Sequence, residues 1–313
     1  MSLAFVFPGQ GSQSVGMLSE LAATNPIIQT TFAEASAALD YDLWDLVTNG
    51  PAELLNQTDK TQPAMLAAGI AMWRVWQQAS PVQPTFFAGH SLGEYTALVA
   101  AGALDFADAI KLVAQRGQFM QQAVPDGEGA MAAILGLDDS DVLAVCDEAS
   151  SLGVVEAVNF NSPGQVVISG AVDAVKQALV LATDKGAKRA ILLPVSVPSH
   201  CALMKPAAEN LSNAITDIAV QTPQITVIHN VSVASSDDPA EIKALLAQQL
   251  YNPVRWVETI QYLAEQGVDT LVECGPGKVL AGLTKRIDRS LTAQALFDTK
   301  TLEKALTLLG ESA

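Results

Sequence analysis

The sequence predicts an α/β protein, because apolar strand-like runs alternate along the chain with helix-forming segments. One of these strand-like runs leads through a Gly-x-Ser-x-Gly turn directly into a helix, and the order of elements changes from about residue 129 onward. The chain has 313 residues, of which 50% are hydrophobic. That is enough for a large core and more than one simple domain needs, so we expect one large domain with an insert.

The first part of the chain predicts strands at residues 4–7 and 84–88, with helices between them through about residue 80. Further helices are expected at 94–101 and 107–122. Between the second strand and the next helix lie residues 89–93 (GHSLG), which are typical of the nucleophile elbow of α/β-hydrolase-like domains. Such a turn exposes its central residue and needs flanking glycines to avoid collisions. Ser91 is therefore the predicted nucleophile; the alternative is a turn with an ordinary N-cap serine.

From residue 130 the expected order is strand (130–135), helix (140–149), strand (154–158), strand (165–168), helix (171–183) and strand (189–193). This βαββαβ order is the ferredoxin-like arrangement, with residues 161–164 (NSPG) connecting the middle strands. After Pro198 the chain returns to helices and buried strands, notably 225–228 and 270–273. We therefore predict a discontinuous large domain, 1–125 and 197–313, with a small ferredoxin-like domain inserted at 126–196.

A serine nucleophile needs a general base, and the chain has three histidines. His90 adjoins Ser91 in the elbow, where successive side chains diverge, so a packing role is favoured. His229 lies in an apolar strand, where a core histidine is expected. His200 lies in a proline-marked loop that enters a helix, and we predict it as the base. No Asp or Glu stands out as a third member, so a backbone carbonyl or an amide is expected to orient it.

The first strand ends in a glycine-paired loop, residues 7–13 (FPGQGSQ). Dinucleotide binding is a weak interpretation, because Ser14 stands where the third glycine of Gly-x-Gly-x-x-Gly belongs. In an elbow enzyme, the oxyanion hole combines the N–H after the nucleophile with one from another strand-to-helix loop. Leu92 and Gln10 are the predicted donors. The alternative is a glycine turn without a ligand.

Arg116 falls on the apolar face of the helix expected at 107–122. An inward guanidinium keeps its charge and requires an anion, and its planar fork suits a carboxylate. We therefore expect Arg116 to bind a substrate carboxylate. A structural salt bridge or a snorkelling stem remains the alternative.

Composition excludes several classes of function. A formal net charge of −16 disfavours nucleic acid and acidic membranes as partners, and no apolar run approaches the about 18 residues of a membrane helix. Three unequally spaced cysteines argue against a disulfide framework. With three histidines and no paired thiols, no metal or other cofactor is expected. We predict a cytoplasmic protein.

Several segments, taken in order, resemble the malonyl-CoA:acyl carrier protein transacylases of bacterial type II fatty acid synthesis, and the similarity covers essentially the whole chain. The matching segments are residues 5–13, 61–64, 89–94, 116–117, 159–165, 196–200, 249–254 and 273–277. The resemblance implies that Ser91 is acylated with His200 as its base. It further implies that Gln10 and Leu92 N–H groups form the oxyanion hole and that Arg116 holds the malonyl carboxylate.

The resemblance also implies supporting roles. Gln249 is expected to orient His200 through its backbone carbonyl, and Gln62 is expected to support the substrate site. No chemistry is attached to Cys274. The implied reaction is ping-pong transfer from malonyl-CoA to the phosphopantetheine thiol of acyl carrier protein. Separately, we expect the protein to be a monomer. A serine esterase or thioesterase is the first alternative, and a non-catalytic carrier-binding subunit is the second.

An acidic carrier protein can dock on this acidic chain only through a basic island. The expected docking residues are basic side chains at the end of the small domain and in the large one: Lys188, Arg189, Lys285 and Arg286, with Lys185 and Lys278 as further candidates. Solvated surface charge is the alternative for each of them.

Overall fold

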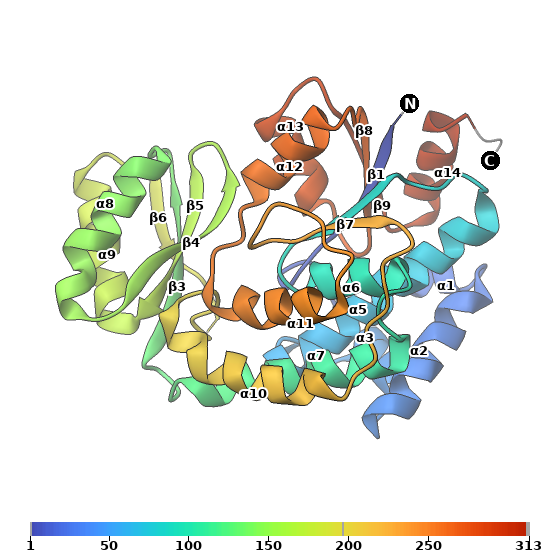
Figure 1. Ribbon diagram of the computed structural model, residues 1–313, viewed down its shortest axis with the longest axis horizontal. Helices are drawn as coiled ribbons and strands as arrows, with labels where there is room; N and C mark the ends of the chain where they lie inside the picture. Colours follow the sequence, from blue (N-terminus) through green and yellow to red (C-terminus); the bar gives the residue numbers. More distant parts are fainter. Residues whose placement is uncertain (1, 196, 311–313) are drawn as a thin grey trace.

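A five-stranded parallel sheet forms the centre of the large part of the molecule (Figure 1). The computed structural model describes residues 2–195 and 197–310. The strand order is β7-β2-β1-β8-β9, and each neighbouring pair is parallel. The strands are β1 (Leu3–Phe7), β2 (Phe86–Gly89), β7 (Thr226–Ile228), β8 (Thr270–Cys274) and β9 (Thr292–Leu296). Helices pack on the sheet, so the predicted α/β class is confirmed.

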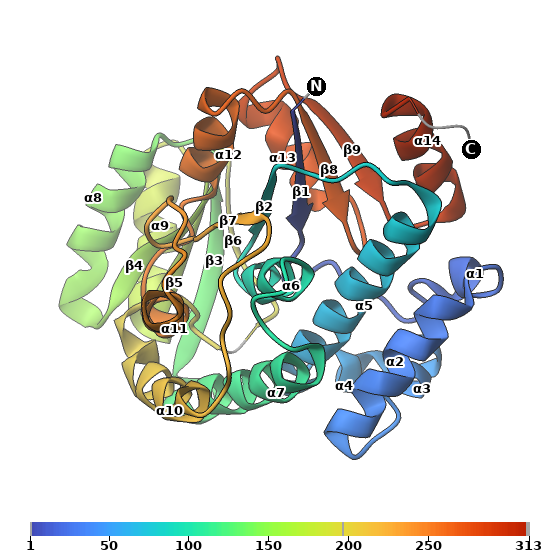
Figure 2. The same ribbon diagram turned by 45° about the vertical axis from the view of Figure 1, so that its right-hand side comes forward.

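Helices α5, α6 and α7 pack against one another, and α6 follows directly after the turn that carries Ser91 (Figure 2). Helix α6 contacts β1, β2 and β7, while α5 contacts both α6 and α7. The helices of this part of the chain are α1 (Ser19–Ala22), α2 (Pro26–Leu39), α3 (Leu43–Asn49), α4 (Ala52–Leu55), α5 (Thr58–Ala79), α6 (Gly93–Ala100), α7 (Phe106–Ala123), α10 (Lys205–Thr216), α11 (Pro239–Gln248), α12 (Trp256–Glu265), α13 (Val279–Ile287) and α14 (Thr299–Leu308).

A second, antiparallel sheet has the order β4-β5-β3-β6 and lies beside the first, with α8 and α9 on its outer face (Figure 1). Its elements are β3 (Gly129–Leu135), α8 (Asp139–Ala149), β4 (Val155–Ser162), β5 (Gln165–Ala171), α9 (Val172–Asp184) and β6 (Arg189–Leu192). The chain order βαββαβ and the strand order together are ferredoxin-like, as predicted. Helices α12 and α13 contact β4 and so connect the two sheets.

The predicted connection at 161–164 is longer than the one observed. Asn161 and Ser162 belong to β4, and Ser162 pairs with Gln165 of β5, so only Pro163 and Gly164 form the turn. Gly164 has φ +70°, and a proline followed by a residue of positive φ is the pattern of a type II turn, in which glycine is favoured at that position. The difference places Asn161 on a strand, and its side chain reaches the elbow. The predicted domain boundary at residue 196 lies outside the described residues.

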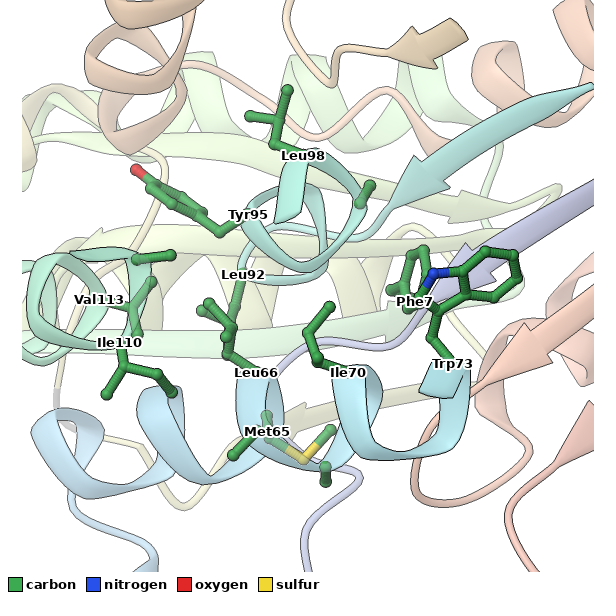
Figure 3. Packing of buried hydrophobic residues seen from close by; sticks show 14 of the residues in the cluster. Phe7, Met65, Leu66, Ile70, Trp73, Leu92, Tyr95, Leu98, Ile110 and Val113 are labelled. Atoms are coloured by element: carbon green, nitrogen blue, oxygen red, sulfur yellow. The ribbon is translucent and has the colours of Figure 1, made fainter. Parts of the chain in front are cut away.

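Buried aromatic and aliphatic side chains between the parallel sheet and α5 form the main core (Figure 3). Phe5 of β1 packs against Trp73 with ring centroids 5.3 Å apart, and Trp73 contacts Phe87 of β2 at 5.2 Å. Leu92, directly after the predicted nucleophile, lies between α6 and Leu66 of α5 in Figure 3 and is buried in the same core. The residue that follows the nucleophile is thus fixed by packing, which holds its N–H in place.

Candidate active site

The turn between β2 and α6 has the geometry of a nucleophile elbow. Ser91 has φ +52°, a left-handed conformation that is strained for a serine. A Cβ on Gly89 would lie 1.9 Å from the Gly93 carbonyl carbon, and one on Gly93 would lie 2.0 Å from Phe7 O. Both positions therefore require glycine because the backbones approach too closely for a side chain.

Asn230 holds this strained turn in place. The backbone N–H of Ser91 donates to Asn230 Oδ1 at 2.8 Å, and Asn230 Nδ2 donates to Gly89 O at 2.6 Å. Asn230 follows β7, which neighbours β2 in the sheet. Asn230 was not predicted as a site residue, although its place after a buried strand, next to His229, was the available signal.

Ser91 and His200 are joined by a hydrogen bond, with Oγ 2.8 Å from Nε2. His200 Nδ1 lies 2.7 Å from the backbone O of Gln249, a carbonyl that can only accept, so Nδ1 carries the proton and Nε2 faces the serine hydroxyl unprotonated. His200 itself has φ +68°, and its backbone N–H donates to Leu250 O at 2.9 Å. The three residues predicted to act together are thus in contact.

The environment of His200 keeps it neutral. Its side chain is buried, and burial lowers its pKa to about 3, with the positive charge of Arg116 acting in the same direction. A neutral imidazole at pH 7 can accept the serine proton, which an imidazolium cannot.

Arg116 points from α7 to the same serine. Its Nη2 lies 3.4 Å from Ser91 Oγ and 2.9 Å from Gln249 Oε1, while Nη1 donates to Gln62 Oε1 at 2.8 Å. The side chain is 1% exposed and its Nε has no partner among the described residues. Burial lowers the pKa of Arg116, yet a guanidinium remains charged at neutral pH. No carboxylate of the described residues pairs with it, which argues against the structural salt bridge.

The loop after β1 passes directly beside the elbow, since a Cβ on Gly9 would lie 2.5 Å from His90 O. Gln10 and Leu92 both line a cavity of about 320 Å³ that also contains Ser91, His200 and Arg116. Within the described residues, neither the Gln10 N–H nor the Leu92 N–H donates a hydrogen bond inside the chain. Both are therefore free to bind an oxyanion in the cavity, as the sequence suggested.

The other two histidines have the packing roles that were favoured for them. His90 Nε2 lies 2.8 Å from Asn161 Oδ1 of β4, and its ring lies 5.5 Å from that of Trp256. His229 is 0% exposed and its Nδ1 lies 2.7 Å from Glu94 Oε1. Glu94 was not identified from the sequence as more than part of the elbow motif.

Comparison with known proteins agrees with this geometry. A family model described as the acyl transferase domain matches residues 4–301. A malonyl CoA-acyl carrier protein transacylase of Salmonella typhimurium is 58% identical over 304 residues, covering 97% of this chain and 98% of that protein. The chain belongs to the acyl transferase domain family, among its malonyl CoA-acyl carrier protein transacylases. Nearly the whole chain takes part in the match, including the predicted nucleophile, base and arginine.

Solved structures of this transacylase family share the fold. An acyl carrier protein S-malonyltransferase from Vibrio cholerae is 57% identical with a TM-score of 0.95, covering 97% of this chain and 100% of that one. A second structure, 54% identical with a TM-score of 0.97 and covering 98% of this chain and 100% of that one, is a malonyl-transacylase in complex with a type II PKS acyl carrier protein. The two-sheet architecture is therefore that of the family.

In this transacylase the predicted docking residues lie on two elements beside the cavity. Arg286 of α13 donates from Nη1 to Gln165 Oε1 at 2.9 Å, and Gln165 lines the cavity. Gln165 pairs with Leu135, which pairs on its other side with Arg189 of β6. All four predicted docking residues, Lys188, Arg189, Lys285 and Arg286, are exposed.

Metal-ligand clusters, membrane-spanning helices and cysteine pairing bear on the possible partners and cofactors. No cluster of three or more His, Cys, Asp or Glu side chains that could hold a metal ion occurs within residues 2–195 and 197–310. In the part of the chain that the structure describes, no helix is long and apolar enough to cross a membrane. The three cysteines are all free and buried.

Proposed function

We propose that the protein transfers the malonyl group of malonyl-CoA to the phosphopantetheine thiol of acyl carrier protein through a malonyl-serine intermediate. The observation that carries this proposal is the position of Arg116, whose Nη2 lies 3.4 Å from the Oγ of a serine that is bonded to His200. A charged guanidinium beside a nucleophile selects an acyl group that carries its own anion. A malonyl group has such an anion two bonds from its thioester carbonyl.

In the first half-reaction, Ser91 Oγ attacks the thioester carbonyl of malonyl-CoA while His200 Nε2 takes the hydroxyl proton. The resulting oxyanion accepts hydrogen bonds from the N–H groups of Gln10 and Leu92. Collapse of this intermediate breaks the C–S bond, and His200 gives its proton to the departing CoA thiolate. In the second half-reaction, the carrier thiol gives its proton to His200 and its sulfur attacks the same carbonyl. The bond between that carbonyl and Ser91 Oγ then breaks, and His200 returns the proton to Oγ.

The neutral partners of Arg116 suit this role. Gln62 and Gln249 each offer it one amide oxygen, which fixes the direction of the guanidinium without neutralising its charge. An incoming carboxylate therefore meets a positioned and still charged fork. A serine esterase would use the same nucleophile and base, but a buried cation beside the nucleophile disfavours the uncharged acyl groups that most esterases process.

We further propose that the carrier protein docks on the basic residues around the hydrogen bond between Arg286 and Gln165, because that bond joins α13 to β5 at a residue that lines the cavity. The carrier's prosthetic arm would enter the cavity there. A cytoplasmic location is part of the proposal and is supported by three unpaired cysteines.

Intact-mass measurement after mixing with malonyl-CoA tests the function. The wild-type protein should gain one malonyl group on Ser91, and added acyl carrier protein should remove it. Ser91→Ala should gain none, because the attacking oxygen is absent. A full adduct in that variant, or an adduct on Cys201 or Cys274, would contradict the proposal. An adduct that water removes as fast as the carrier protein does would favour the hydrolase.

A further inference from the structure

Gln249 forms hydrogen bonds with Ser91, His200 and Arg116 of the proposed reaction centre. Its backbone O accepts from His200 Nδ1 at 2.7 Å, and its side-chain Oε1 accepts from Arg116 at 2.9 Å. Its Nε2 donates to Ser91 O at 2.9 Å and to Glu94 Oε2 at 2.7 Å. The residue is 0% exposed, so no water competes for these positions. The orientation of this one amide therefore decides which atom faces the arginine.

Chemistry allows only one orientation of the amide. A guanidinium has donors only, so the group facing Arg116 has to be the amide oxygen. The carbonyl of Ser91 and the carboxylate of Glu94 have acceptors only, so they require the amide nitrogen with its two hydrogens. A turn of the amide by 180° would place donors against donors and acceptors against acceptors in a buried site, where each unmade bond is costly.

Glu94 is itself held rigidly. It lies in the first turn of α6, is 1% exposed, and accepts from His229 Nδ1 at 2.7 Å through Oε1. Its Oε2 also accepts from the backbone N–H of Asn230 at 3.0 Å. Both contacts come from the segment after β7, so the carboxylate cannot turn away from Gln249. Glu94 makes no hydrogen bond or ion pair with Arg116 among the described residues, although its negative charge raises the pKa of the guanidinium from a distance.

We propose that Glu94 is a positioning residue for substrate selection, whose buried carboxylate fixes the Gln249 amide with its oxygen toward Arg116. The inference deepens the proposed function and rests on it. A carboxylate in direct contact with Arg116 would neutralise the charge that the substrate needs. The Gln249 amide lies between Glu94 and Arg116, so Glu94 can orient the guanidinium through it. The guanidinium keeps its charge for the substrate carboxylate.

Glu94→Gln tests the proposal, because an amide side chain at this position can offer either a donor or an acceptor to Gln249. It therefore removes the restraint that Glu94 adds to those from Arg116 and Ser91 O. The malonyl-to-acetyl ratio of kcat/KM should fall about tenfold, the effect expected for one hydrogen bond to a charged group. Most of the change should be a rise in KM for malonyl-CoA. Gln249→Met keeps the backbone carbonyl that orients His200 but removes the amide oxygen, and it should reproduce the fall in the ratio.

His229→Gln is the matched control, since it disturbs the other oxygen of Glu94 and does not contact Gln249. The malonyl-to-acetyl ratio of kcat/KM in this variant should remain that of the wild type even if the thermal stability of the variant falls. The double variant of Glu94→Gln and Gln249→Met should lose no more selectivity than Gln249→Met alone, because both act through one contact.

An unchanged ratio in folded Glu94→Gln, or an equal loss for both acyl groups, would show a structural role only and overturn the proposal. If Glu94→Gln does not fold, Glu94→Asp replaces it, because the shorter side chain withdraws the carboxylate from Gln249. An unchanged ratio in that variant and in Gln249→Met overturns the proposal equally. Failure of the wild type to transfer malonyl groups would instead contradict the proposed function.

Discussion

At the scale of single residues, the proposed base differs from the histidine of a Ser-His-Asp triad because no carboxylate accepts from its Nδ1. The backbone O of Gln249 takes the place that an acidic side chain has in a serine triad. A neutral carbonyl holds the tautomer but does not stabilise a positive imidazole as an anion would. This arrangement fits a site that already contains the charge of Arg116, because a second full charge is avoided until the proton moves.

Arg116→Ala should reduce malonyl transfer much more than acetyl transfer. Truncating one partner of a buried charge pair costs about 2 to 5 kcal/mol, which corresponds to some orders of magnitude in kcat/KM for malonyl-CoA. Arg116→Lys should rescue only partly, because an ammonium keeps the charge but loses the planar fork. The malonyl-to-acetyl ratio of kcat/KM is the measurement, with folding checked by circular dichroism. An unchanged ratio in a destabilised variant would assign Arg116 a structural role.

The low pKa of His200 predicts how stability depends on pH. The folded pKa is about 3 and the ordinary value is 6.5, so between these values the unfolded chain binds the proton and the folded one does not. The stability of the wild type should therefore fall as pH drops below 6.5. Urea unfolding at pH 7.5 and 5.5 should show a loss about 1 kcal/mol larger for the wild type than for His200→Gln. Equal losses would contradict the neutral buried histidine.

The same pKa has a kinetic consequence. Acylation of Ser91 in a single turnover should show no acidic limb near pH 6.5, because the base stays unprotonated well below that value.

At the scale of elements, the site could be predicted where its residues share one local pattern. The elbow joins a strand, two glycines and a helix within consecutive residues, so the motif itself predicts it. Arg116 is on the apolar face of a single helix, so helical periodicity predicts that it points inward. Asn230 and Glu94 could not be found in this way. Their roles depend on β7 lying next to β2 in the sheet, and strand order is not encoded in local periodicity.

The junction of β8 and α13 gives a prediction of opposite sign. Glu273 is 1% exposed; its Oε2 accepts from the Ala281 N–H at 2.8 Å, while its Oε1 has no partner among the described residues. Burial raises its pKa to about 7, against the opposing effect of the α13 N–H groups. The folded state therefore binds more protons than the unfolded state between pH 4.5 and 7, so this group lowers stability as pH rises through that window.

Glu273→Gln lacks this titration and should gain stability relative to the wild type as pH rises. The difference between their unfolding free energies should change in favour of the variant by about 3 kcal/mol between pH 4.5 and 7.5. Denaturant unfolding at both pH values measures it. A difference that is constant with pH would mean that the carboxyl is ionised throughout the window.

At the scale of the whole molecule, the cavity is built by both sheets. Ser91 and Leu92 lie in the turn that follows β2 of the parallel sheet, while Asn161 and Gln165 lie on strands of the antiparallel one. The sequence predicted both sheets because their element orders differ, but it did not predict how they face each other. The bond between His90 and Asn161 depends on that packing, and the boundaries at 126 and 196 remain predictions.

Docking of the carrier protein is the prediction that involves the whole surface. The chain carries a net charge of −16, so an acidic carrier should be repelled except where exposed basic residues such as Lys188, Arg189, Lys285 and Arg286 provide local positive charge. Reversing these four charges should slow malonyl transfer to the carrier, more strongly at low salt, because screening weakens the attraction that is lost. Transfer to a small pantetheine thiol should be unaffected, since that acceptor needs only the cavity.

Lys304→Glu is the matched control for a single reversal such as Arg189→Glu, because both change the net charge by the same amount. Lys304 lies on α14, across the molecule from the antiparallel sheet (Figure 1). Lys304→Glu should alter the carrier rate little, since at physiological salt charges interact over only about 8 Å. Stopped-flow or mass-based rates at two salt concentrations distinguish the outcomes. A loss shared by both acceptors would mean a damaged cavity, and an equal loss in Lys304→Glu would mean that total charge, not this basic surface, governs how the carrier approaches.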